Sequence, residues 1–538
     1  MNPSSSATVQ PADRLDGLPD PARRLVAEVN SALQRRDAAT TLQRLAALQA
    51  IAPRHPEVLR LCAAVARLQG RIEDAIGLLR EAVAARPADT LARTNLAHLV
   101  AESAPEIAVA ELRCCCELEP QQSVHRLGLA QMLDRSGDAE GARAVLDEWL
   151  QREPGDASAR LALARVLQTL GRGDAAAAEY RRLLAQAPDA IPAWYGLSTL
   201  QRHALDADDV VAIERIHART DLAESARASI GFALARAREA VGRHAEAWDA
   251  LASANAGWRR RQHWDAARFT HHVQSVLGAF ADRPRAESDR SRGSGLVFII
   301  GLPRSGSSIV EQILATHPDV AAGGELEHAT GIIRGESERR EQDFPGWVAS
   351  TDERDWTRLA HAYLARVEAR RGAQRVFTDK NLMNWLYIGA LRAMLPGARF
   401  IDCRRDPLEN CIACYRQMFS RELGFTYDLD ELVAFWRDYD RAMRHWRALH
   451  PEAIHEVVHE QMVAAPEAGI HRLLEFCGLP FDERCLRFHE FERGVRTLSA
   501  DQVREPLRAD TARAHLYGSK IDRLRALIAG AGETRDRR

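Results

Sequence analysis

Aromatic side chains are nearly absent from the first part of this chain. Only 6% of its 538 residues are aromatic, and none of them occurs before Trp149, whereas 28 of the 32 lie from Phe232 onward. A core without rings has to be filled by closely packed small and aliphatic side chains. At about 100–200 residues per domain the length allows two to four domains. The uneven distribution of aromatic residues indicates that the two halves of the chain are built differently.

The chain also lacks an excess of charge and any long apolar run. Its 73 Lys and Arg residues nearly balance 75 Asp and Glu residues, giving a formal charge of −2, which argues against nucleic acid as the main partner. The apolar stretch at residues 296–302 is far shorter than the roughly 20 residues of a membrane span. The opening segment MNPSSSATVQ has no basic region followed by an apolar one. No secretory signal is therefore expected, and a cytoplasmic location is predicted.

Patterns typical of metal sites are missing as well. Cys411 and Cys414 form a CxxC pair with no second pair at zinc spacing. His455 and His459 are four residues apart but have no third ligand at a suitable position. We therefore predict no metal site and interpret the nine cysteines as packing thiols in a reducing compartment.

What the first half does contain is a repeat. Four prolines recur at intervals of 33 or 34 residues, and an alanine precedes each by twelve residues and a large side chain by eight. Small residues let two antiparallel helices approach, the large residue fills the gap to the next pair, and proline ends the second helix. These positions are Ala75, Leu79 and Pro87; Ala108, Leu112 and Pro120; Ala142, Leu146 and Pro154; and Ala176, Tyr180 and Pro188.

This register resembles tetratricopeptide repeats. The resemblance implies an α-helical solenoid, which we place at residues 21–262 after a disordered N-terminus at 1–20. Such a solenoid would bind a peptide or partner protein in its groove. A spacer or dimerisation arm is the alternative, since binding depends on sites rather than on the fold.

A different kind of sequence follows a charged, Ser/Gly-rich linker. The segment LVFIIGLPRSGSSIVEQILATHP predicts a buried strand at 296–300, a tight turn at 301–308 and a helix at 309–316. A strand, a glycine loop and a helix N-terminus together hold phosphate through backbone N–H groups. The two glycines of the turn have the spacing of a nucleoside-triphosphate loop, but Ser307 occupies the position of its lysine. This difference argues against a nucleotide kinase.

Two later strands are predicted to end beside the same loop. Lys380 follows one of them, and Arg404 and Arg405 follow the other. Because α/β folds bind ligands at the carboxyl ends of their strands, we expect Lys380 and Arg405 to face the same crevice as Arg304. Arg404 is expected to pair with a surface carboxylate. Glu325 comes just after a short apolar segment and is a candidate base.

The segments PRSGSS, GGEL, FTDK and CRRDPLENC resemble the sulfotransferase family, specifically bacterial proteins in which tetratricopeptide repeats precede a sulfotransferase domain. The resemblance implies an α/β P-loop-like domain with a central parallel sheet, which we place at 295–528, after a helix and linker at 263–294 and before a charged tail at 529–538. It also implies transfer of a sulfonate group from 3′-phosphoadenosine 5′-phosphosulfate (PAPS) to a hydroxyl of a peptide, carbohydrate or small molecule.

The resemblance assigns roles residue by residue. A glutamate base, a lysine and a serine of its tyrosylprotein branch match the catalytic candidates Glu325, Lys380 and Ser499. The donor-binding candidates are the phosphate loop and two further arginines: Arg304, Ser305, Gly306, Ser307, Ser308, Arg405 and Arg513.

The sequence departs from the family pattern at a few of these places. Ala413 stands where a serine is expected, Leu382 where a proline is expected, and Ala514 and His515 where a basic residue and a tryptophan are expected. The alternative hypothesis is therefore a catalytically impaired scaffold that acts through protein–protein interaction of its repeats. A homodimer is compatible with either hypothesis.

Overall fold

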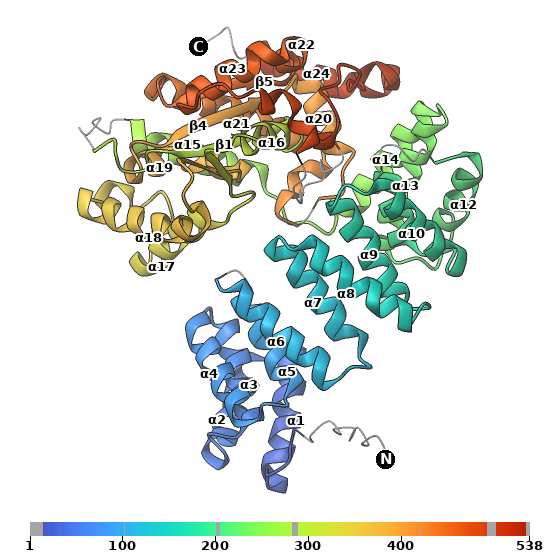
Figure 1. Cartoon of the computed structure of the whole chain (residues 1–538), viewed down its shortest axis with the longest axis vertical. Coiled ribbons are helices and arrows are strands. Elements are labelled where there is room, and N and C mark those ends of the chain that lie inside the picture. The colour runs from blue at the N-terminus through green and yellow to red at the C-terminus, as the bar shows by residue number, and fades with distance from the viewer. Residues whose placement is uncertain are drawn as a thin grey trace, which may run out of the picture. The chain divides into compact units, whose positions relative to one another are not determined.

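The computed structural model describes residues 14–101, 103–200, 205–281, 289–419, 421–491 and 502–533. Internal contacts divide the chain into two compact units, Met1–Leu183 and Leu184–Arg538, and each is considered by itself (Figure 1). The division falls within helix α10 and so inside the region predicted to be repeats. No helix of the described residues is both long and apolar enough to cross a membrane.

The first unit is an array of helices that pack mainly against their neighbours in sequence. Figure 1 draws them from blue to teal. Their bounds are α1 (Asp20–Arg35), α2 (Ala38–Ile51), α3 (Pro56–Leu68), α4 (Ile72–Ala85), α5 (Thr90–Val100), α6 (Pro105–Leu118), α7 (Ser123–Ser136), α8 (Ala139–Arg152), α9 (Ala157–Thr169) and α10 (Gly173–Gln186).

The repeated positions have the burial that close helix packing requires. The four alanines of the repeat register are 0% exposed. Each repeated proline stands two residues beyond the end of an even-numbered helix, from α4 to α10. The predicted helical repeat is confirmed. Because alanine and leucine fill most of this core, few rings are needed.

Regular structure begins at residue 14, before the end of the predicted disordered N-terminus at residue 20. Residues 14–17 form a turn, and the buried side chain of Leu18 joins the core cluster that contains Ala22 and Val26 of α1. This apolar contact holds the segment before α1 in place. Residues 1–13 of the predicted disordered segment lie outside the described residues.

The second unit begins with further helices and continues into a parallel sheet. Its first helices are α11 (Ile191–Thr199), α12 (Ala207–His217), α13 (Glu224–Ala240), α14 (His244–Arg259) and α15 (Ala266–Ala281). The strands are β1 (Leu296–Gly301), β2 (Val320–Ala322), β3 (Val376–Asp379), β4 (Arg399–Arg404) and β5 (Ile454–Val458). They pair in the order β2-β3-β1-β4-β5, every pair parallel.

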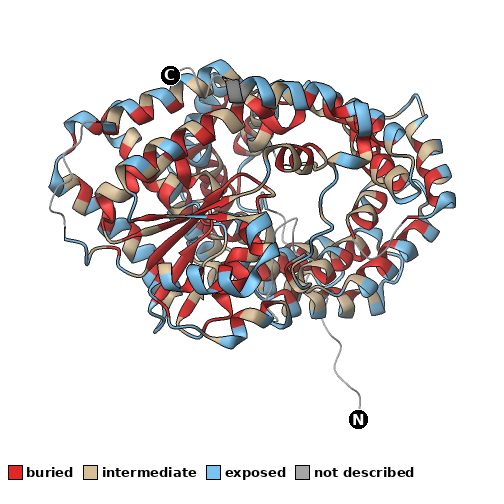
Figure 2. Cartoon of the chain, turned by 90° about the horizontal axis from the view of Figure 1, so that it is seen from above, coloured by how far each residue is buried: buried red, intermediate tan, exposed pale blue. Residues whose placement is uncertain are grey.

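Strands β1 and β3 are buried along their whole length, and Figure 2 shows them in red. Parallel strands buried on both faces read as continuous apolar runs, which is why the segment LVFII identified β1. The predicted fold class, a helical repeat followed by an α/β domain with a central parallel sheet, is confirmed.

Helices cover this sheet and connect its strands. The α-helices are α16 (Ser307–Ala315), α17 (His328–Arg340), α18 (Glu353–Arg371), α19 (Ile388–Met394), α20 (Pro407–Tyr415), α21 (Leu429–Leu449), α22 (His459–Ala464), α23 (Pro466–Cys477) and α24 (Asp522–Glu533). The 3-10 helices are η1 (Val348–Ser350), η2 (Leu382–Tyr387), η3 (Arg421–Tyr427), η4 (Glu483–Glu490), η5 (Gln502–Arg504) and η6 (Ala514–Ile521).

Helix α14 packs directly against η3 and η6 of the sheet-bearing part of the unit. Asn255 Nδ2 of α14 donates a hydrogen bond of 2.9 Å to the carbonyl oxygen of Tyr415. Arg259 pairs with Glu431 at 2.6 Å. The ring of Trp248 lies 5.4 Å from that of Tyr415, centroid to centroid. These contacts explain why the compact unit begins before the end of the predicted repeat region. The predicted linker contributes residues 282–288, which lie outside the described residues.

Candidate active site

The carboxyl ends of the five strands bring most of the predicted site residues to one edge of the sheet. The phosphate loop follows β1, Glu325 follows β2, Lys380 follows β3 and Arg405 follows β4. Because the strands are parallel, these ends lie on the same side. His459, which follows β5, joins them.

The loop after β1 has the backbone of a phosphate cradle. Gly301 approaches β4 so closely that a Cβ there would lie 2.6 Å from the carbonyl oxygen of Cys403. Arg304 has a φ of 66°, a left-handed conformation that costs a non-glycine residue about 1–2 kcal/mol. Gly306, with a φ of 96°, is the N-cap of α16. The helix therefore begins at Ser307, two residues before the predicted start, and its first-turn N–H groups face the loop.

Helix α20 fixes the position of this loop. Asn410 Nδ2 and Cys414 Sγ both donate to the carbonyl oxygen of Pro303, at 2.9 and 3.1 Å. The Cys414 thiol is thus a packing and hydrogen-bonding group, and burial raises its pKa to about 12. Because α20 also follows Arg405 directly, the loop and the arginine are held by one element.

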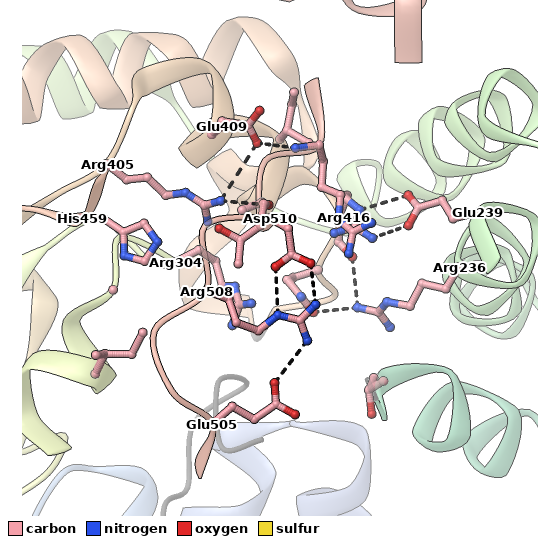
Figure 3. A pocket seen from close by; sticks show the side chains of 18 of the residues that line it. Arg236, Glu239, Arg304, Arg405, Glu409, Arg416, His459, Glu505, Arg508 and Asp510 are labelled. Carbon is pink, nitrogen blue, oxygen red and sulfur yellow. Dashed lines mark hydrogen bonds and ion pairs between the residues drawn. The ribbon is translucent and has the colours of Figure 1, made fainter. Parts of the chain in front are cut away.

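A cavity of about 390 Å³ opens beside this loop (Figure 3). It brings together Arg304, Gly306, Ser308, Arg405 and Arg513 of the predicted donor-binding residues. Further lining comes from helices outside the sheet and from the segment after η5: Ser198, Thr199, Leu200, Leu205, Arg236, Glu239, Ala240, Ile309, Glu409, Ile412, Ala413, Arg416, Gln417, His459, Glu505, Pro506, Leu507, Arg508, Asp510 and Thr511.

The remaining loop serines lie elsewhere. Ser305 lines a second cavity, of about 420 Å³, together with Arg404 and Arg405, and its buried Oγ has no hydrogen-bond partner within the described residues. Ser307 is buried at the start of α16 and lines neither cavity. Ser499 lies outside the described residues.

Positive charge is concentrated around Arg304. Burial, followed by the fields of Arg405, Arg416 and Arg236, lowers the pKa of Arg304 to about 10. The guanidinium therefore keeps its charge at neutral pH, and three further arginines act on it. Burial and Arg405 together lower the pKa of His459, so its imidazole is neutral at pH 7. The cluster is suited to an anion of more than one charge.

Arg405 lies two residues before the start of α20 and is held in place by the segment that follows η5. Its Nη2 donates to the carbonyl oxygen of Thr511 at 3.2 Å, and it lies 4.0 Å from the carboxylate of Glu409. Glu409 in turn accepts hydrogen bonds from the backbone N–H groups of Arg513 and Ala514, at 2.8 and 2.9 Å. Arg405 Nε is buried without a hydrogen-bond partner in the described part of the chain, which is the environment an oxyanion would complete.

Arg404, although adjacent, has a different role. It pairs with Asp402 at 3.0 Å and with Asp440 at 2.9 Å. Both carboxylates are buried, but Arg404 also pairs with the exposed Glu456 at 3.2 Å, so it has the expected surface carboxylate as a partner in addition to two buried ones. The side chain alternation of β4 directs Arg404 towards the interior, which the sequence pattern of two consecutive arginines does not reveal.

Glu325 and Lys380 form an ion pair at the neighbouring strand ends. Lys380 Nζ lies 2.7 Å from Glu325 Oε1. The lysine side chain is 2% exposed and the glutamate 58% exposed. Neither residue lines the cavity of about 390 Å³ that contains Arg304 and Arg405 (the arginine cavity). The pair therefore presents one exposed carboxylate whose position is set by a buried ammonium group.

The backbone around this pair is fixed by a buried carboxylate. Glu311, on α16, accepts a hydrogen bond of 3.0 Å from the N–H of Gly324. The N–H of Lys380 donates to the carbonyl oxygen of Gly324 at 2.9 Å. Glu311 is only 1% exposed. One helix thus begins at the phosphate loop and, one turn later, positions the residue before Glu325.

Sequence reasoning missed three groups of this site. His459 could have been found by the same strand-end rule that identified Lys380, but β5 is short and half exposed. Glu311 is an acidic residue within an apolar helix, and the sequence does not show that its side chain is buried. Arg236 and Glu239 lie on α13, and no local pattern connects that helix with the loop. Within the described residues, no group of three or more His, Cys, Asp or Glu side chains gathers as a metal site would require.

Two segments of the chain match known protein families. Residues 297–483 match the sulfotransferase family, and residues 133–200 match the tetratricopeptide repeat. The first range contains the phosphate loop, Glu325, Lys380 and Arg405, and ends before Arg513.

Curated proteins of several organisms are similar to parts of this chain. An uncharacterized protein of Aquifex aeolicus is 30% identical over 293 residues, which is 52% of this chain and 38% of that protein. The match thus spans well under half the length of this relative. Protein-tyrosine sulfotransferase A of Caenorhabditis elegans is 25% identical over 290 residues, 46% of this chain and 70% of that protein.

Among solved structures, the sulfotransferase domain from the curacin biosynthetic pathway is 16% identical, with a TM-score of 0.32, and covers 44% of this chain and 98% of its own. The two family matches alone show that a tetratricopeptide-repeat region precedes a sulfotransferase-family domain in this chain.

Proposed function

We propose that the chain transfers a sulfonate group from PAPS to a hydroxyl acceptor. The family match and the protein-tyrosine sulfotransferase relatives support sulfotransferase activity in general. The single observation that carries the finer proposal is the arginine-lined cavity beside the phosphate loop, next to the Lys380–Glu325 pair at the same edge of the sheet.

The residues of this cavity fit a donor with separate anionic groups. The loop from Arg304 to Ser308 would hold the phosphosulfate through the N-terminus of α16. Arg405, with its buried and unpaired Nε, and Arg513 would hold a second phosphate. The lysine of a nucleoside-triphosphate loop is replaced by Ser307, so the proposal excludes phosphoryl transfer from ATP.

The neighbouring ion pair is suited to proton transfer and charge stabilisation. The donor supplies an electrophilic sulfur and a phosphate leaving group. The exposed carboxylate of Glu325 would accept the proton of the acceptor hydroxyl. Lys380 would hold that carboxylate in position and offset the negative charge that develops during transfer. Arg304 and the helix N-terminus would offset the charge on the leaving phosphate.

The helical repeats would bind the acceptor or a partner protein. Support for this part is the repeat match itself, because the acceptor class depends on a site that the sequence does not specify. We also propose a cytoplasmic location. All nine cysteines are free thiols, which supports a reducing compartment.

One observation favours the scaffold as a second candidate. Ala413 lines the cavity with a methyl group where the family resemblance implies a serine hydroxyl. A weaker donor site would leave a domain that binds a ligand or partner without catalysing sulfonate transfer.

Binding of the desulfonated product, 3′-phosphoadenosine 5′-phosphate, tests the donor assignment. A ligand that binds only the folded state raises the midpoint of thermal unfolding in proportion to the logarithm of its concentration. We expect this product to raise the midpoint and ATP with Mg²⁺ to leave it unchanged. Stabilisation by ATP with Mg²⁺ but not by 3′-phosphoadenosine 5′-phosphate would contradict the proposal. Binding of the product without transfer to a tyrosine peptide, an oligosaccharide or a simple phenol would favour the scaffold.

A further inference from the structure

Helix α13 forms part of the wall of the arginine cavity. It contributes Arg236, Glu239 and Ala240 to the lining. This helix lies outside the range that matches the sulfotransferase family. A helix from the helical part of the unit therefore reaches the same space as the phosphate loop.

The charges on this wall do not cancel. Arg416 is paired with Glu239, whose Oε1 accepts from Arg416 Nε at 3.0 Å and which also accepts from the hydroxyl of Tyr517. Arg236 has neutral partners: its Nη2 donates to Gln417 Oε1 at 2.7 Å and to the carbonyl oxygen of Arg416 at 3.1 Å. No carboxylate pairs with Arg236 in the described part of the chain, and its Nη1 is buried without a hydrogen-bond partner there.

The rest of the cavity shows the same excess of positive charge. Six arginines line it against four carboxylate residues. Arg508 pairs with Asp510 at 2.6 Å and with Glu505 at 3.3 Å. Arg508 is shared by two of the four acids and Arg416 pairs with a third, so the six arginines leave an excess of two positive charges in the lining, and Arg236 has no carboxylate within ion-pair distance among the described residues.

The side chain of Arg236 is held in place before any ligand binds. Its guanidinium lies 5.3 Å from the ring centre of Tyr195, a cation–π distance, and Figure 3 shows it pointing from α13 towards Arg416. A side chain held between a ring and two hydrogen-bond acceptors loses little further conformational entropy when it binds a ligand.

The arrangement along α20 indicates which anion it would take. Glu409, Ile412, Ala413 and Arg416 all line the cavity, and their spacing places them on one face of the helix. Arg405 stands before the start of this face, and Arg236 bonds to the residues just after its end. Between them the face offers the small side chain of Ala413. Two arginines thus flank a space at which α20 offers the apolar side chains of Ile412 and Ala413 between Glu409 and Arg416.

We propose that Arg236 binds the ribose phosphate of the donor nucleotide together with Arg405, so that a helix of the helical part completes the donor site. This inference rests on the proposed function, because it takes PAPS as the donor. It makes the helical part a component of the sulfotransferase site in addition to any role in binding a partner.

The test compares two ligands that differ by one phosphate. Titration calorimetry of the full chain would measure affinity for 3′-phosphoadenosine 5′-phosphate and for adenosine 5′-phosphate, which lacks the ribose phosphate. We expect Arg236→Ala to weaken binding of the bisphosphate by about tenfold or more, as for loss of a hydrogen bond between charged groups. Adenosine 5′-phosphate lacks the phosphate that Arg236 would bind, so its affinity should change by no more than about twofold. Arg236→Lys should restore part of the loss.

Arg238→Ala is the matched control. Arg238 lies two residues along the same helix, pairs with Glu214 at 2.7 Å and does not line the cavity, so this variant should bind both ligands as the wild type does. Unchanged binding of the bisphosphate by Arg236→Ala, or an equal loss for both ligands, would overturn the inference while leaving the proposed donor in place. A wild-type chain that binds neither ligand would instead overturn the proposed function itself.

Discussion

Lys380 Nζ lies 2.7 Å from Glu325 Oε1, although 55 residues separate the two along the chain. They follow the adjacent parallel strands β3 and β2, so the sheet brings them together. The buried ammonium and the exposed carboxylate form a unit in which one partner orients the other. The chain offers few such groups, because Lys380 and Lys520 are its only lysines.

Replacing Lys380 by methionine should abolish most of the transfer while sparing donor binding. Removal of one positioned group that stabilises developing charge typically costs on the order of 10²–10³ in rate. Lys380 does not line the arginine cavity, so the affinity for 3′-phosphoadenosine 5′-phosphate should change little. Steady-state kinetics and calorimetry of the Lys380→Met variant would check both expectations.

Lys520→Met supplies the control for that variant. Lys520 pairs with Asp249 at the surface, 2.7 Å away, and exposed pairs contribute little to stability. Turnover of the control should match the wild type. Near-native turnover in Lys380→Met, or an equal loss in both variants, would contradict the role given to Lys380.

Glu311 is expected to act as a positioning residue. Its carboxylate accepts the N–H of Gly324, the residue before Glu325, so Glu311→Ala should lower kcat by about tenfold, with KM for the donor nearly unchanged. Glu311→Gln keeps an oxygen acceptor and should restore most of the activity. Equal kcat for the two variants, at equal thermal stability, would refute a positioning role.

Asp379 should make stability depend on pH. Burial raises the pKa of Asp379 to about 7, whereas an unfolded aspartate has a pKa of about 3.9. The folded state therefore binds the proton more tightly, and the resulting stabilisation is complete below about pH 4 and is lost as the pH rises to about 7. The free energy of unfolding of Asp379→Asn, relative to the wild type, should increase across this interval. Denaturant titrations at several pH values would check it, and a constant difference would be the contrary result.

Ala413→Ser should strengthen donor binding. The side chain faces the arginine cavity, and a hydroxyl there would add a hydrogen bond worth about 0.5–1.5 kcal/mol, or roughly twofold to twelvefold in affinity for 3′-phosphoadenosine 5′-phosphate. Calorimetry on the two chains would measure the gain. A loss of affinity would mean that the space beside α20 does not receive a phosphate.

Much of this architecture follows from local sequence patterns. The repeat register predicted the helix pairs because each alanine, large residue and proline acts within one pair of helices. The strand-end rule predicted that Lys380 and Arg405 lie at one edge of the sheet, because a parallel sheet collects its carboxyl ends there. Only Arg405 lines the cavity that contains Arg304, so the expectation that Lys380 faces the same crevice is not met.

The parts that could not be predicted depend on contacts between distant segments. Arg236 meets Arg416 and Gln417 across 180 residues or more, and its neighbours on α13 give no sign of this partnership. Glu311 is polar by type and buried by context. Arg404 and Arg405 are consecutive in sequence, and only the direction of each side chain determines that Arg405, and not Arg404, lines the cavity that contains Arg304.

Transfer of radiolabelled sulfonate from PAPS is the decisive test of sulfotransferase activity in this chain. The full chain would be incubated with the labelled donor and with a tyrosine peptide, an oligosaccharide and a simple phenol, and the product would be identified by mass spectrometry. We expect a sulfated product of at least one acceptor, with a rate of formation that falls by a factor on the order of 10² or more in Arg304→Ala and Lys380→Met. Absence of transfer to every acceptor, or undiminished transfer by either variant, would contradict this expectation.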